Sequence, residues 1–149
     1  MCIRDRPKYV QNNFKTIKVH PTGNVHIAIL KTLQEINSLR PKINNNIDPK
    51  IFSKISKPEI INEASDFVIT FNGKKETDKS FILFKSGVIE GYGYFELYNN
   101  INSEKKINSR LVKVDSSKRV KNYVYRLISE KRYKKLVNLK EIYKFSDIE

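Results

Sequence analysis

The chain has 149 residues, with 29 Lys and Arg against 16 Asp and Glu, so its formal net charge is +13. This length is enough for one ordinary domain with its own core. No apolar run approaches the roughly 20 residues of a membrane-spanning helix, and the single cysteine excludes a disulfide framework or a multi-cysteine metal site.

The surplus of positive charge is the first indication of function. Lysine outnumbers arginine by 22 to 7 beside 19 Ile and 15 Asn, a bias that AT-rich codons produce, so part of the excess is genomic. Even so, this charge on a small chain favours polyanions, and nucleic acid is the default partner. The alternative is that the lysines only solubilise the protein. Because the first thirty residues lack an apolar signal segment, we expect a cytoplasmic location and no membrane partner.

Residues 1–6, with the sequence MCIRDR, match the translation of a transposon end used in sequencing libraries. The only Met and the only Cys of the chain both lie in this hexapeptide. We therefore expect residues 1–6 to be foreign, and the remainder to be the C-terminal part of a longer protein. A genuine basic N-terminus is the alternative.

The first half of the chain predicts a strand, a turn and a helix. Apolar residues alternate with lysines in Phe14–His20, which indicates a short strand. A turn follows at Pro21–Asn24, where Thr22 or Asn24 can cap a helix over Val25–Leu39. Pro41 ends that helix. The Asn-rich run 43–48 reads as a loop, and 48–64 as a connector with about two helical turns.

The second half predicts an antiparallel meander. Strands rich in β-branched and aromatic residues span Asp66–Phe71, Ser80–Phe84 and Val88–Phe95, separated by short turns. Gly91 and Gly93 in the third strand indicate a bulge or a close backbone approach.

An amphipathic helix is predicted over Ser117–Lys131, where apolar residues recur at helical spacing and Asp115, Ser116 or Ser117 can cap the start. The basic tail 132–145 is compatible with either a strand or a helix. We expect the helix to cover one face of the meander. One shared core is then predicted to contain Val68, Phe81, Leu83, Tyr92, Val124, Leu127 and Ile128.

Three segments together resemble a known family. The resemblance is to the closing strand, turn and helix of a GIY-YIG nuclease domain. It covers the segment 19–24, the pairs 29–30 and 35–36, and the segment 39–44. That domain occurs in the incision subunit of bacterial excision repair and in fusions with a proofreading-type exonuclease domain. The strands of 78–94 and the helix 117–128 resemble the segment that follows it in the fusions.

The predicted strands and helices make an α/β (α+β) chain, and the resemblance divides this chain into several parts. Residues 7–45 would be the end of a GIY-YIG-like domain, 46–64 a linker, and 65–149 an accessory α+β domain with a basic helix. The chain would then be a DNA-binding portion of a DNA-repair nuclease. The alternative is a non-catalytic module that binds nucleic acid or protein.

The catalytic residues that the family would supply are missing from this chain. The tyrosine hairpin and the catalytic arginine lie upstream of the matched helix, and the position of the metal-binding glutamate falls on Thr32. A hydroxyl cannot replace a carboxylate as an anionic ligand of Mg²⁺ or Mn²⁺. Glu35, one turn away, is a weak substitute. We therefore expect no metal cofactor and no catalytic residue in this chain, and a divalent metal in the parent protein if that is active.

Other residues suggest chemistry only weakly. His20 and His26 are six residues apart across a turn and could converge on a metal, but nothing else in the pattern supports this, and His26 is more often a residue on a helix surface. Tyr92, Tyr94 and Phe95 could stack on bases but more often pack in a sheet. The basic helix is the stronger candidate, with further cations at 131–135. The predicted nucleic-acid-binding residues are Arg40, Lys42, Asn44, Lys118, Arg119, Lys121 and Arg126.

Overall fold

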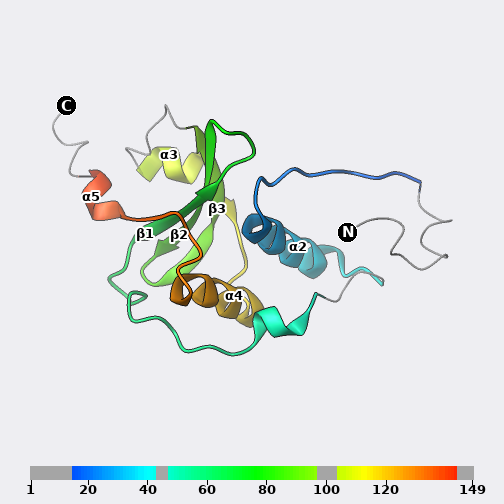
Figure 1. Ribbon diagram of the computed structural model, residues 1–149, viewed down its shortest axis with the longest axis horizontal. Helices are drawn as coiled ribbons and strands as arrows, with labels where there is room; N and C mark the ends of the chain where they lie inside the picture. Colours follow the sequence, from blue (N-terminus) through cyan, green and yellow to red (C-terminus); the bar gives the residue numbers. More distant parts are fainter. Residues whose placement is uncertain (1–14, 43–46, 97–103, 144–149) are drawn as a thin grey trace.

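The computed structural model describes residues 15–42, 47–96 and 104–143. These residues form an antiparallel five-stranded sheet in the order β4-β3-β2-β1-β5, with helices on both faces (Figure 1), which confirms the α+β class. The strands are β1 (Phe67–Asn72), β2 (Asp78–Lys85), β3 (Val88–Glu96), β4 (Val112–Lys113) and β5 (Lys135–Asn138). The helices are α2 (Val25–Leu39), the 3-10 helix η2 (Pro49–Phe52), α3 (Glu104–Ser109), α4 (Lys118–Ser129) and α5 (Leu139–Tyr143).

The predicted three-strand meander is confirmed as β1, β2 and β3, and its third strand contains a bulge. Leu83 pairs with Gly91 while the next residue, Phe84, pairs with Ile89, so Glu90 is the extra residue of the bulge. Gly91 is also a point of close approach, because a Cβ there would overlap the carbonyl oxygen of Val112 in β4. Both features expected of the glycine-containing strand are therefore present.

Helix α2 spans the predicted residues, and its first turn is attached to the β1–β2 hairpin. The Asn24 side chain accepts a hydrogen bond from the Ile27 amide at 3.0 Å, which caps the helix. Its amide nitrogen donates to the Asn72 carbonyl at 2.8 Å and to the Ser80 hydroxyl oxygen at 2.7 Å. The N-cap therefore fixes where α2 meets the sheet.

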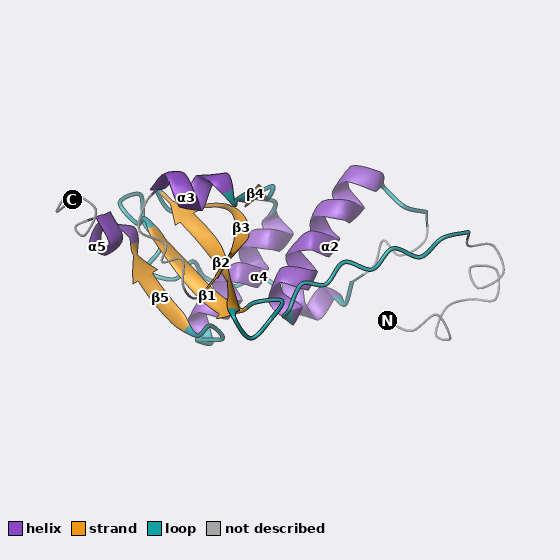
Figure 2. Ribbon diagram, turned by 90° about the horizontal axis from the view of Figure 1, so that it is seen from above, coloured by secondary structure: helices purple, strands orange, loops and turns teal. Residues whose placement is uncertain are grey.

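The two faces of the sheet bury separate clusters. Helices α2 and α4 cover one face, and α3 and α5 cover the other, as the two views of Figures 1 and 2 show. On the first face, Ile27, Leu30 and Leu33 of α2 join the same cluster as sheet and α4 residues. Helix α2 therefore shares its core with the sheet. The division of the chain into the segments 7–45, 46–64 and 65–149 stays a prediction.

The single predicted core is wrong, because its residues belong to different faces. Val68 and Leu83 are paired across β1 and β2 and therefore point to the same side. They lie with Phe81 against α3 and α5. The other four residues lie on the opposite face with α2 and α4: Tyr92, Val124, Leu127 and Ile128. The prediction that the basic helix covers one face of the meander is nevertheless confirmed.

Other expectations from the sequence are corrected or refined. The strand expected at Phe14–His20 does not form in its described part, 15–20, which has no strand partner; Phe14 lies outside the described residues. The connector contains only the single short helix η2. The tail forms both a strand and a helix, since β5 pairs with β1 and α5 follows directly. Strand β4 and helix α3 were not predicted.

The contact of Gly91 with β4 predicts a specific defect. Replacing Gly91 with Ala should push β4 away from the sheet, at a cost of about 1–3 kcal/mol of unfolding free energy. Urea denaturation measures this cost. The control is Glu90→Ala, which truncates the half-buried bulge residue next to it without adding an atom toward β4. Equal destabilisation by the two variants would contradict the account.

Candidate nucleic-acid interface

Helix α4 separates apolar and basic residues onto different sides. Ser117 caps the helix by accepting from the Val120 amide at 3.4 Å, as the sequence predicts. The buried side holds five residues that pack on the sheet and α2: Val120, Tyr123, Val124, Leu127 and Ile128. Because that side is held in the core, Lys118, Arg119 and Lys121 remain exposed to solvent.

The 3-10 helix η2 packs along α4 and brings more cations to it. The Arg119 guanidinium lies 5.0 Å from the centre of the buried Phe52 ring, a cation–π contact. The Asn122 side chain donates to the Phe52 carbonyl at 3.0 Å. These contacts hold η2 against α4, and the exposed Lys50 and Lys54 lie within η2 and just after it. We call the five residues Lys50, Lys54, Lys118, Arg119 and Lys121 the α4–η2 surface.

Arg126 is placed differently from the sequence expectation. It was predicted among the solvent-facing cations, but its side chain is only 29% exposed and bonds within the protein. Its guanidinium donates to the Ser53 hydroxyl and to the Ser53 carbonyl at 3.3 Å, and lies 3.7 Å from the Glu130 carboxylate. Arg126 therefore fixes η2 to α4. We leave it out of the α4–η2 surface for that reason, and its contact with nucleic acid stays a prediction.

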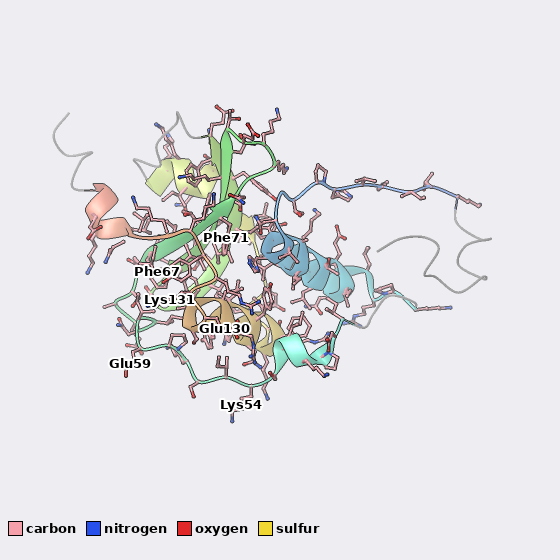
Figure 3. The ribbon with its side chains drawn as sticks, viewed as in Figure 1. Lys54, Glu59, Phe67, Phe71, Glu130 and Lys131 are labelled. Carbon is pink, nitrogen blue, oxygen red and sulfur yellow. The ribbon has the colours of Figure 1, made fainter. Side chains whose placement is uncertain are left out.

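Cations continue past the end of α4. Lys131, Arg132, Lys134 and Lys135 are all exposed. The Arg132 side chain lies 2.6 Å from the Glu130 carboxylate, which therefore holds two arginines. Figure 3 shows Lys131 and Glu130 near the end of α4, and Lys54 pointing outward beyond η2. The basic residues thus extend from η2 along α4 to the start of β5.

The remaining predicted residues of this group lie near the end of α2. Arg40 is the C-cap of α2 in a left-handed conformation, with φ 43°. Arg40 and Lys42 are exposed, and Asn44 lies outside the described residues. Arg40 and Lys42 thus belong to the end of α2, whereas the other predicted residues belong to α4.

The residues considered for metal binding are engaged within α2. The Thr32 hydroxyl donates to the Ala28 carbonyl at 2.7 Å, and Glu35 lies 3.7 Å from the Lys31 ammonium. The described residues contain no group of three or more His, Cys, Asp or Glu side chains that could share a metal ion.

The aromatic residues of β3 pack within the protein. Tyr92 is buried, and the Phe95 ring lies 6.1 Å from that of Phe81. Tyr94 donates its hydroxyl to the Thr22 carbonyl at 3.0 Å while the Lys74 ammonium sits 4.4 Å from its ring centre. Burial raises the pKa of Tyr94 to about 12. These contacts favour the packing role over base stacking.

Sequence reasoning did not single out the contact between His26 and Tyr123, which joins α2 to α4. The His26 Nδ1 atom and the Tyr123 hydroxyl are 2.7 Å apart, and the His26 ring lies 5.2 Å from that of Phe71. Burial, and secondarily the charge of Arg132, lower the pKa of His26, while burial raises the pKa of Tyr123 to about 12. The tyrosine therefore keeps its proton and the imidazole is neutral, and the tautomer of His26 sets which of the two groups donates. The helical spacing of His26 with the buried Leu30 and Leu33 was the available signal.

This contact predicts acid sensitivity. The pKa of His26 is lower in the folded chain than its ordinary value of 6.5 in the unfolded chain. The stabilising effect of the neutral ring is therefore complete above pH 6.5 and decreases as the pH falls through the folded pKa. Chemical denaturation from pH 8 to about pH 5 should show this loss in the wild type and less of it in His26→Gln. The idea is wrong if both chains lose the same free energy over that range.

Comparison with models of protein families, with curated proteins and with solved structures finds no match. Across the described residues, no helix is both long enough and apolar enough to cross a membrane.

Proposed function

We propose that the chain is a nucleic-acid-binding portion of a cytoplasmic DNA-processing protein, and that it holds duplex DNA through the α4–η2 surface. The observation that supports this is the arrangement of α4, whose apolar side is buried while Lys118, Arg119 and Lys121 face solvent beside Lys50 and Lys54. Exposed cations on neighbouring elements bind a phosphate backbone because they release its condensed counterions.

The composition of this surface favours binding without sequence recognition. Four of its five cations are lysines, which present point charges rather than the bidentate donors that read base edges. Its one arginine is stacked on Phe52, which holds the guanidinium near the protein. Such contacts position a protein on the backbone and specify no bases. We therefore expect weak binding with little preference between sequences.

The first test is the salt dependence of DNA binding. Lys118→Ala/Arg119→Ala/Lys121→Ala should weaken binding to a labelled duplex and lower the slope of log K against log salt by about 2–3 units, since each phosphate contact contributes about 0.9. Fluorescence anisotropy over a range of salt concentrations measures both quantities for duplexes of different sequence.

The matched control removes three exposed lysines elsewhere. Lys75→Ala/Lys105→Ala/Lys140→Ala changes the net charge by the same amount. Its three positions lie in the β1–β2 turn, in α3 and in α5, and both helices are on the face of the sheet opposite α4 (Figure 1). It should keep most of the wild-type affinity and slope. Equal losses of affinity and of slope in the two variants would mean that the net charge, and not the α4–η2 surface, determines DNA binding. Equal affinities for all three chains would favour the alternative, in which the lysines are a solvated face of a module with another role.

The proposed relationship to GIY-YIG nucleases rests on the sequence resemblance, and it predicts no cleavage by this chain. The tyrosine hairpin has no counterpart in the sequence, and the hydroxyl of Thr32 is bonded to its own helix. Supercoiled plasmid incubated with the chain and Mg²⁺ or Mn²⁺ should therefore stay uncut. Metal-dependent nicking that Glu35→Gln abolishes, and that Glu59→Gln on the connector retains, would contradict this prediction.

A further inference from the structure

Glu130 is the one acidic residue in a long basic stretch of the sequence. Residues 116–140 contain nine Lys and Arg side chains and a single carboxylate, that of Glu130, which is the C-cap of α4. The Arg132 Nε atom donates to this carboxylate at 2.6 Å, and the Arg126 guanidinium lies 3.7 Å from it. Two guanidinium groups therefore converge on one carboxylate at the end of the helix, where Figure 3 labels Glu130.

The position of Glu130 adds little to the stability of the helix. A negative charge at the C-terminal end of a helix is repelled by the helix dipole. Its partner Arg126 precedes it by four residues, and an ion pair in this order stabilises a helix less than the reverse order. The Glu130 and Arg132 side chains are 36% and 63% exposed, and exposed ion pairs contribute little to stability. Another anion can therefore replace the carboxylate with little loss of folding free energy.

Lys131, the residue after the C-cap, has a backbone conformation that favours glycine. Its φ is 53°, and its amide donates to the Ile128 carbonyl at 3.1 Å. The Arg132 amide donates to the Leu127 carbonyl at 2.9 Å, which completes the turn that ends α4. A side chain is strained in this left-handed conformation. A lysine at such a position indicates that its exposed charge has a role.

We propose that a backbone phosphate of bound DNA takes the place of the Glu130 carboxylate. The phosphate is then held by Arg126, Lys131 and Arg132. This inference rests on the proposed function, because it adds a site to the same DNA-binding helix. Arginine uses the same donors for carboxylate and phosphate oxygens, so the guanidinium groups that hold Glu130 can also hold a phosphate. Arg126 stays bonded to Ser53 and supplies a fixed positive charge, while the exposed Lys131 and Arg132 make the contact.

The Glu130 carboxylate should weaken DNA binding, because it competes with the phosphate for Arg132. An exposed ion pair corresponds to a factor of at most about five in an equilibrium constant. Glu130→Gln should therefore bind duplex DNA about three to five times more tightly than the wild type. A phosphate reaches Arg132 in both chains, so the slope of log K against log salt should be the same in both.

Fluorescence anisotropy with a labelled duplex at several salt concentrations tests the site. The control is Glu141→Gln, which changes the net charge equally but lies in α5 on the other face of the sheet. It should change the affinity by less than about 1.5-fold. Arg132→Ala should lower the slope by about 0.9, the contribution of one phosphate contact. When added to Arg132→Ala, Glu130→Gln should gain no more than the control, because the group that it frees is gone.

A second variant separates binding from stability. Lys131→Gly should raise the urea midpoint of unfolding, since glycine adopts the left-handed conformation without strain. It should nevertheless weaken DNA binding about two- to threefold, because a phosphate contact is lost. Lys140→Ala, which removes an exposed cation of α5, is the charge control and should leave the affinity nearly unchanged. Circular dichroism checks that every variant is folded.

Equal affinities of the Glu130→Gln and Glu141→Gln chains would overturn the proposal, as would an Arg132→Ala chain with the wild-type slope. A Glu130→Gln slope about one unit steeper than that of the wild type would also overturn it, because Glu130 would then keep Arg132 in the wild-type complex. In each case the triple variant of α4 can still lose affinity, and the proposed α4–η2 surface then stands without this site. A wild type that binds no duplex would remove both proposals.

Discussion

Strand β2 is buried on both of its faces, and the arrangement of the other elements depends on this. Phe81, Ile82, Leu83 and Phe84 are four consecutive residues, each at most 2% exposed. An antiparallel sheet can leave one face to water, but an apolar run that fills both faces must be covered twice. Helices α2 and α4 cover one side, and α3 and α5 cover the other. The edge strands β4 and β5 are short, which limits the unpaired backbone at each edge of the sheet.

The burial of β2 on both faces also explains which parts of the fold could be predicted from the sequence. The bounds of α2, and those of α4 except its last two residues, followed from helical spacing and from cap candidates that included Asn24 and Ser117, which are local signals. The three meander strands followed from their composition. The assignment of Val68 and Phe81 to one core with Leu127 failed, because a continuous apolar run has no alternation to show which residue faces which helix. Strand β4 has two residues and is too short for any period.

The candidate site likewise contains residues that a local pattern predicts and residues that only distant contacts position. Lys118, Arg119 and Lys121 were predicted to be exposed because the apolar stripe of α4 defines the opposite side of the helix. The role of η2 was not predictable, since it depends on Phe52 packing against a helix some seventy residues away. That packing turns Arg126 inward and adds two lysines to the surface. His26 is a similar case, because its partner Tyr123 lies 97 residues further along the chain.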